Sequence, residues 1–267
     1  MIDRFSEDID LIIDRKLLGF EELNSNSQVK KLRKKSGNFI VNEFREELIH
    51  QLTILGISSS LYEIKFNDTI DDTSDPTTLE IHYKSVLNTN YNYIQKRVLL
   101  ELGARSLTEP SENKTISSFI DSHFKQLPFA QVAFEVQVVK PIRTFIEKVL
   151  LLHEEFSKPS DKIRTDRLTR HLYDLEKMMD TSHGIEAIQE QELFKTIVEH
   201  RKKVTPIRGM DYSNHKKGKL RITPPKEVFK NWGNDYKEMQ QFMMTGESLT
   251  WNALIERIKE IERRFNS

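Results

Sequence analysis

The strand-like segments of this chain all lie before residue 140, and every apolar-periodic segment after Pro141 is helical in pattern. Short runs of alternating polarity, rich in β-branched and aromatic residues, indicate strands, whereas apolar residues three and four apart indicate helices. Strands are expected over residues 8–13, 61–66, 77–86, 94–104 and 130–139. Helices are expected over residues 27–55, with a break near Ser36–Gly37, and over 115–124. The pattern predicts an α+β fold, with a mixed sheet and flanking helices over residues 1–140.

The second half is expected to form a helical bundle domain over residues 141–267. Pro141 begins a helix over residues 141–156, in the first turn, where proline is favoured. Further helices are expected over residues 166–180, 186–204, 224–244 and 249–265. These segments carry apolar stripes with no strand between them, so they are predicted to pack on one another.

The composition excludes several classes of protein. The chain has no cysteine, which rules out a disulfide scaffold, thiolate metal ligands and a cysteine nucleophile. No apolar run approaches the ~18 residues of a membrane span, and charged residues interrupt the apolar residues near the N-terminus, unlike a signal peptide. The chain is therefore expected to be cytoplasmic and not to bind membranes.

Basic residues are concentrated in two runs although the whole chain is neutral, with 41 basic and 41 acidic residues. The runs are "KKLRKK" (30–35) and "HKKGKLR" (215–221). Each alone is typical of a solvated helix face or loop. Together they are candidates for holding a polyanionic substrate beside an active site.

The segment "RFSEDIDL" (4–11) places acids within a predicted strand. Alternate residues of a strand share a face, so Asp8 and Asp10 project together, next to Glu7 in the chain. Adjacent carboxylates repel each other unless a cation lies between them, and hard oxygen ligands suit Mg²⁺ or Mn²⁺. The alternative is a solvated strand end or a helix cap with incidental acids.

A pair of metal ions needs at least three carboxylates, with the third typically from another strand. Glu101 lies in the apolar strand "VLLELGARS" and is the first candidate, and Glu80 in "TLEIHY" is its rival. For both, the alternative is an outward-facing side chain on a half-exposed strand.

The helical half adds residues that suit phosphate. Lys148 lies on a helix face and can act as a point charge towards phosphate oxygens, or it can pair on the surface with Glu147 or Glu155. Asp174 follows Arg170 by four residues in "RHLYDL", which is also the spacing of an ordinary helix salt bridge.

Four stretches, taken in order, resemble the successive motifs of the AbiEii/AbiGii abortive-infection toxin nucleotidyltransferases. They are "RFSEDIDL", "VLLELGARSLTEP", "RTFIEKVLLLHEEF" and "RHLYDLEKM". The late stretch "DYKEMQQFMMTGESLTWNALIERIKEIE" is similar to the C-terminal helical segment of that family. The resemblance spans nearly the whole chain, and it implies a polymerase-β-like nucleotidyltransferase sheet fused to a helical bundle.

The resemblance also implies roles for individual residues. Asp8 and Asp10 match the paired metal-binding aspartates, and Glu101 matches the strand position of the third acid, so these three would bind Mg²⁺ or Mn²⁺. Lys148 matches the lysine that contacts nucleotide phosphates, and Asp174 matches the acid of the following helix. By the same resemblance, Asp8, Asp10, Lys148 and Asp174 are the expected catalytic residues, and Lys148, Asp174 and Arg170 the expected nucleotide-binding residues.

The implied activity is metal-dependent transfer of a nucleoside monophosphate from an NTP substrate to a hydroxyl group of RNA, a protein or a small molecule. The implied setting is that of a toxin restrained by a cognate antitoxin. One departure is that family members carry a glycine–serine segment on a helix before the paired aspartates, and residues 1–7 contain none. The alternative function is therefore a catalytically inactive nucleotide-binding or interaction module that retains the fold.

Overall fold

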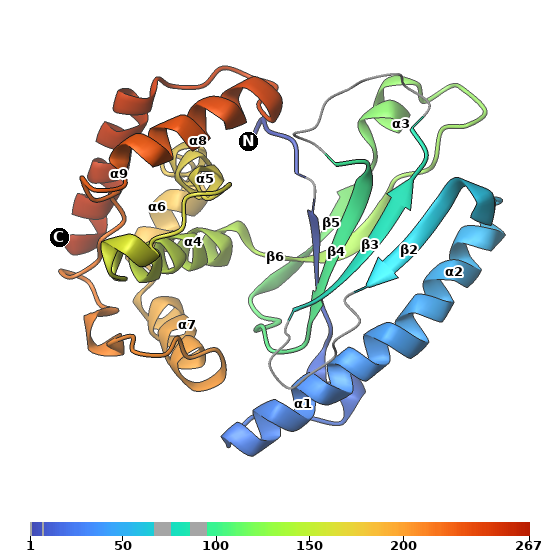
Figure 1. The fold of residues 1–267 in the computed structure, drawn as a ribbon, viewed down its shortest axis with the longest axis horizontal. Helices are drawn as coiled ribbons and strands as arrows, with labels where there is room; N and C mark the ends of the chain where they lie inside the picture. Colours follow the sequence, from blue (N-terminus) through green and yellow to red (C-terminus); the bar gives the residue numbers. More distant parts are fainter. Residues whose placement is uncertain (1, 7, 67–75, 86–94) are drawn as a thin grey trace.

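The computed structural model describes residues 2–6, 8–66, 76–85 and 95–267. Residue 7, which precedes Asp8, lies outside these ranges. So do residue 86, the last of the predicted strand 77–86, and residue 94, the first of the predicted strand 94–104. Figure 1 shows a lobe that contains the strands, beside a second lobe built of helices. This arrangement confirms the α+β class predicted from the sequence pattern.

The main sheet has four strands in the order β1-β4-β3-β2. Their bounds are Asp8–Ile12 for β1, Tyr62–Phe66 for β2, Thr77–Tyr83 for β3 and Arg97–Gly103 for β4. β1 runs parallel to β4, whereas β4 and β2 each run antiparallel to β3. The sheet is therefore mixed, as expected, with β1 and β2 at its edges.

A second sheet consists of β5 (Ser111–Ile116) and β6 (Phe134–Val139), paired antiparallel. The predicted helix over residues 115–124 is wrong at its start, because Thr115 and Ile116 pair with β6. Helix α3 covers only Phe119–His123 and begins after Ser118, whose hydroxyl caps its first turn.

Helices α1 (Asn26–Phe39) and α2 (Arg45–Ile54) join through a π-helical turn at Ile40–Phe44. The predicted break near Ser36–Gly37 is wrong, since both residues lie inside α1. Val29, Leu32, Ser36 and Ile40 recur at helical spacing and are buried. Ser36 and Gly37 are both buried, so tertiary burial outweighs the local preference of these residues for a break.

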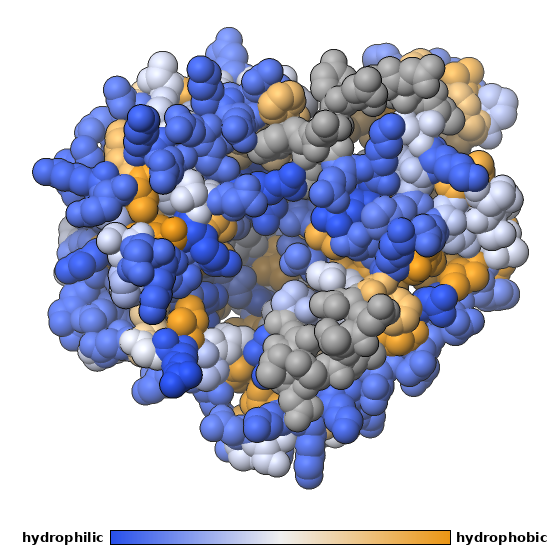
Figure 2. Space-filling model, in the orientation of Figure 1, coloured by the Kyte–Doolittle hydropathy of each residue, from blue (hydrophilic) through white to orange (hydrophobic). Residues whose placement is uncertain are grey.

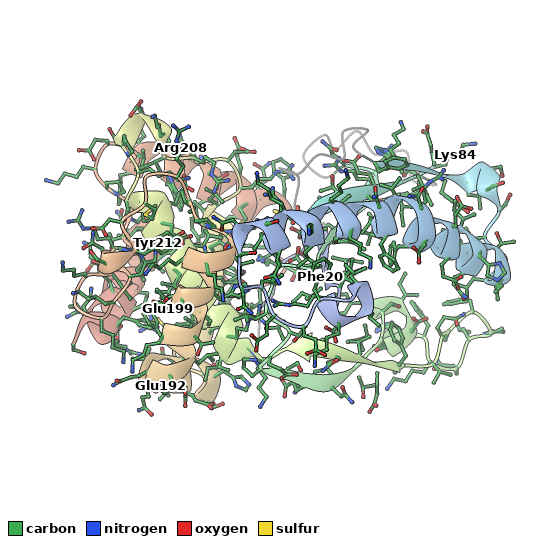
Figure 3. The ribbon with its side chains drawn as sticks, turned by 90° about the horizontal axis from the view of Figure 1, so that it is seen from below. Phe20, Lys84, Glu192, Glu199, Arg208 and Tyr212 are labelled. Carbon is green, nitrogen blue, oxygen red and sulfur yellow. The ribbon has the colours of Figure 1, made fainter. Side chains whose placement is uncertain are left out.

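The core of the strand-containing lobe lies between α1 and one face of the main sheet. Leu32 of α1 packs in one cluster with Leu79, Leu100 and Leu102 of the strands. Phe20, which lies beside α1 in Figure 3, packs against the same cluster. The other face of the sheet carries polar side chains of β1, β3 and β4 together with Leu99.

The helical lobe begins directly after β6. Its helices are α4 (Pro141–Phe156), α5 (Thr169–Met178), α6 (Ser182–Gln189), α7 (Gln191–Val204), α8 (Phe229–Phe242) and α9 (Trp251–Asn266). The single helix predicted over residues 186–204 is wrong, because the backbone leaves the helical region at Glu190 and separates α6 from α7. The break lets Ala187 and Phe194, on opposite sides of it, both enter the core that also holds Trp232 and Phe265.

Short 3-10 turns complete the described elements, at Arg15–Leu18, Ser59–Leu61, Ser160–Lys162 and Tyr212–Asn214. Residues 141–267 are all described and contain no strand beyond an isolated bridge between Met244 and Arg4. Within the described ranges, no helix combines the length and apolar character needed to cross a membrane.

The two lobes are joined by backbone contacts near the N-terminus. Phe5 N donates to Met243 O at 2.6 Å, and Thr245 N donates to Asp3 O at 2.9 Å. At the other side of the molecule, the N-terminal end of α1 lies against α7, and Lys203 Nζ donates to Asn24 Oδ1 at 3.2 Å (Figures 1 and 3). These contacts hold β1 at the boundary between the lobes.

Candidate active site

Strands β1 and β4 bring three carboxylates to one face of the main sheet. Asp10 lies opposite Glu101 in the parallel ladder, and Asp8 lies opposite Leu99. Paired residues and their neighbours two positions away share a face, so the three acids project together. The intervening Leu100 is buried in the core on the other face. We call Asp8, Asp10 and Glu101 the carboxylate cluster.

Glu80, the alternative third acid, lies on the same face but is engaged elsewhere. Its carboxylate accepts a hydrogen bond from Arg97 Nη1 and lies 2.7 Å from His82 Nε2. Burial acts to raise the pKa of Glu80, but the bonds to Arg97 and His82 hold it below its ordinary value. The acid beside the two aspartates is therefore Glu101.

Asp10 and Glu101 lie opposite each other on β1 and β4, and the pKa of each is raised. Burial is the main cause for both carboxyl groups. The charge of Asp8 adds to the rise at Asp10, and the charges of Asp10 and Asp8 add to the rise at Glu101. Carboxylates this close favour sharing a proton, so the cluster is a place where a bound cation would relieve repulsion.

Asp8 is held in its charged form by two neighbours. Burial alone would raise its pKa, but Ser6 Oγ donates to Oδ1 at 2.6 Å and Arg170 Nη1 donates to Oδ2 at 3.1 Å. Together they lower the pKa of Asp8 below its ordinary value. Arg170 of α5 thus reaches across to the sheet and does not form the helix salt bridge with Asp174 that its spacing allows.

Asp174 lies at the junction of the two lobes, with its side chain only 1% exposed. Arg4 donates to it from Nε at 2.7 Å and from Nη2 at 2.8 Å, and Lys148 Nζ lies 2.9 Å from Oδ2. Burial acts to raise the pKa of Asp174, and these two cations lower it below its ordinary value. A segment before β1 and helices α4 and α5 therefore meet at this carboxylate.

Lys148 faces this junction and not its helix neighbours. Glu147 pairs with Arg143, and Glu155 pairs with Lys158 and Arg164. The positive charge of Lys148 also acts to lower the pKa of Asp10.

His171 adds a neutral acceptor beside the lysine. Its Nδ1 lies 3.3 Å from Lys148 Nζ. Burial, with the charges of Lys148 and Arg170, lowers the pKa of His171 to about 3, so its ring is neutral at physiological pH. An ammonium has three donors; among the described residues, Asp174 and His171 are the groups within reach of Lys148 Nζ.

The structure adds Arg4, Ser6 and His171 to the residues named from the sequence. No local signal distinguishes Arg4, because its partner Asp174 is 170 positions away. The only indication in the sequence is that Arg4 and Asp174 each lie in one of the quoted motifs, "RFSEDIDL" and "RHLYDLEKM". Figure 2 shows the surface hollowed between the lobes, on the side viewed in Figure 1.

The basic runs lie apart from this cluster or behind it. The cations of residues 30–35 stand on the outer side of α1, which covers the opposite face of the sheet from the carboxylates. The expectation that this run holds substrate beside the carboxylates is therefore wrong, because the sheet separates them. The run 215–221 follows a turn that packs beside α7.

The cluster suits a hard divalent cation by donor chemistry, because all three side chains offer carboxylate oxygens. As they stand, the described residues contain no group of three or more His, Cys, Asp or Glu arranged to hold a metal ion. In this arrangement Asp8 is turned to Arg170 and Ser6, which engage both of its carboxylate oxygens. The residue types fit Mg²⁺ or Mn²⁺, provided that these contacts are exchanged for the ion.

A sequence model of the family described as nucleotidyl transferase AbiEii toxin, type IV toxin–antitoxin system, matches residues 1–260. The chain belongs to the AbiEii family. The family is one of nucleotidyl transferase toxins of type IV toxin–antitoxin systems, so the resemblance seen in the sequence motifs is confirmed. No curated protein and no solved structure gives a significant match.

Proposed function

We propose that this AbiEii-family chain is a metal-dependent nucleotidyltransferase that moves a nucleoside monophosphate from an NTP to a hydroxyl group of RNA, a protein or a small molecule, with release of pyrophosphate. The proposal extends the family assignment to a named site and to metal dependence. One observation carries it: Asp8, a carboxylate of the sheet, is paired with Arg170, a cation of the helical lobe that lies 162 positions away in sequence.

The carboxylate cluster is proposed to hold Mg²⁺ or Mn²⁺ through Asp8, Asp10 and Glu101. A bound ion of this kind neutralises phosphate charge and makes an attacking hydroxyl group more acidic. Because Asp10 and Glu101 already repel each other, the cluster gains more from a divalent cation than isolated carboxylates would.

The cations are proposed to bind the triphosphate. Arg170 neutralises Asp8 in the structure, and a metal ion at Asp8 would free its guanidinium to meet phosphate oxygens. Lys148 is proposed to donate an N–H for the same purpose, while Asp174 and His171 fix the direction of its ammonium. Asp174 thus acts by positioning Lys148 and Arg4. Nucleotidyl transfer depends chiefly on such positioning and charge neutralisation.

The activity is tested by incubating the protein with α-³²P-labelled NTPs, Mg²⁺ and total RNA, with the double variant Asp8→Ala/Asp10→Ala as the control. A labelled product that nuclease degrades identifies RNA as the acceptor. A product that resists nuclease but is degraded by protease identifies a protein, and a product that resists both identifies a small molecule. Labelling by the wild type and not by the variant supports the proposal. Nucleotide binding without any transfer would instead support the inactive module.

Lys148→Ala is expected to weaken NTP binding by about tenfold, because one charge-assisted contact to phosphate is lost. Lys195→Ala is the matched control, since Lys195 pairs on the surface with Glu192. Isothermal titration calorimetry with a non-hydrolysable NTP analogue measures both. An unchanged affinity in Lys148→Ala would remove this lysine from the nucleotide site.

The remaining partners follow from the same family. A cognate antitoxin that restrains this activity is proposed on the type IV description of the family. A cytoplasmic location is proposed as well, where NTPs, RNA and such an antitoxin would all meet the chain.

A further inference from the structure

An apolar surface covers α3 and the segments on either side of it, away from the carboxylate cluster. Phe119 is 96% exposed and Val132 is 89% exposed, values that are unusual for large apolar side chains. Figure 2 shows orange side chains at the upper right, where Figure 1 places α3. The exposed apolar residues are Ile116, Phe119, Ile120, Phe124, Leu127, Phe129, Val132 and Phe134, and we call them the α3 surface.

The α3 surface is held in shape by its own polar contacts. Ser118 Oγ accepts from Asp121 N at 2.9 Å, and Asp121 Oδ1 accepts from Gln131 N at 2.9 Å, which ties the start of α3 to the segment before β6. The rings of Phe124 and Phe129 meet edge to face, with centroids 6.2 Å apart. A surface fixed in this way loses little conformational entropy when it is covered by a partner.

The area and the charge of the α3 surface indicate its partner. With aromatic side chains of about 150–250 Å² each, the exposed fractions sum to roughly 900 Å² of apolar surface. The largest patch on an ordinary monomer is about 300–600 Å², whereas each side of a standard protein interface buries about 800 Å². Residues 116–134 contain one acid, Asp121, and one base, Lys125, so the surface is neutral. A neutral apolar surface of this size is complementary to another neutral apolar surface. It offers no positive charge to the phosphates of a nucleic acid.

We propose that the α3 surface is a symmetric interface between two copies of this chain. In a two-fold arrangement the same patch covers itself, so its area, apolar character and lack of net charge are matched by construction. The carboxylate cluster contributes none of these residues, and the inference stands whether or not the chain transfers nucleotides.

The test is the mass of the full-length chain measured by sedimentation equilibrium across a wide concentration range. The wild type is expected to reach twice the 31.5 kDa mass of the chain at micromolar concentrations. Phe119→Asp/Val132→Asp is expected to weaken the dimer by about a hundredfold or more, because it places two charges in the buried interface. These side chains are almost fully exposed, so the substitutions remove nothing from the core of the monomer.

Ile185→Asp is the matched control, an exposed apolar residue on α6 of the other lobe, and it is expected to leave the dimer unchanged. Thermal melting of each variant verifies that the monomer still folds. A wild type that stays monomeric at all concentrations would overturn the proposal. A dimer that keeps its dissociation constant in Phe119→Asp/Val132→Asp would overturn it equally.

Discussion

Asp174→Asn is expected to lower the free energy of unfolding by about 3 kcal/mol, because it leaves two nearly buried cations without their carboxylate. Arg4 and Lys148 have side chains only 11% and 16% exposed, and both depend on Asp174. The loss is large because Arg4 belongs to the segment that precedes β1, whereas Lys148 and Asp174 belong to the helical lobe. Denaturant unfolding of the wild type and the variant measures the difference.

The effect of Asp174→Asn is expected to depend on pH. The folded-state pKa of Asp174 is lowered, so the stability that its charge contributes is present above its ordinary pKa and is lost as the pH falls through the folded value. The difference between wild type and variant is therefore expected to be constant at neutral pH and to shrink below pH ~4. Asp180→Asn is the control, since Asp180 pairs with Arg257 and Arg264 but is 58% exposed; it is expected to cost less than about 1 kcal/mol. If Asp174→Asn and Asp180→Asn lower the free energy of unfolding equally, the contacts of Asp174 contribute no more than an exposed ion pair.

Asp10→Asn is expected to reduce nucleotidyl transfer on the order of a thousandfold, equivalent to about 4 kcal/mol of transition-state stabilisation. The substitution removes one charge from the carboxylate cluster and with it a proposed metal ligand. The labelled-NTP transfer assay measures the loss. Glu80→Gln is the control, because Glu80 lies on the same face of the sheet but is bound by Arg97 and His82. If Glu80→Gln loses nucleotidyl transfer while Asp10→Asn keeps it, the metal site has been assigned to the wrong carboxylates.

The same Asp10→Asn variant is expected to be slightly more stable than the wild type when no metal is present. The raised pKa of Asp10 means that its charge destabilises the folded state, and this cost appears as the pH rises through the folded value. Although burial raises its pKa, Asp10 keeps part of its surface in contact with water, which screens the effect, so a rise of about 2 °C in melting temperature is expected at pH 7. Added Mg²⁺ should stabilise the wild type more than the variant, and the opposite order would contradict the proposed metal site.

The sequence predicted the main elements well because periodicity reports local structure. Alternation around Ile9 placed Asp8 and Asp10 on one face, and the strands around Leu79 and Leu100 were correctly placed as well. It failed where tertiary packing outweighed local preference. Ser36–Gly37 continues a helix in which both residues are buried, and Glu190 interrupts a helix without any break in the apolar pattern.

The composition of the candidate site was less accessible to sequence reasoning. Lys148, Arg170 and Asp174 could be named from their motifs, but their actual partners lie on other elements and are set by how the lobes meet. The sequence does not single out Arg4, because an arginine before a strand is common. Its contact with Asp174 joins two segments that are distant in sequence, and periodicity reports only local structure. Separating Glu101 from Glu80 required knowing that β4, and not β3, pairs with β1.

We propose that the carboxylate cluster and the facing cations form one nucleotide site that a divalent ion completes. The decisive measurement is isothermal titration calorimetry of the non-hydrolysable analogues of ATP, GTP, CTP and UTP, each in a separate titration, with and without Mn²⁺. We predict that Mn²⁺ tightens the binding of at least one analogue to the wild type by about tenfold or more, because it neutralises the carboxylates and frees Arg170. In Asp8→Ala/Asp10→Ala the enhancement should disappear. An affinity in the wild type that is the same with and without Mn²⁺, or an enhancement that persists in the double variant, would rule out a metal-completed nucleotide site at these residues.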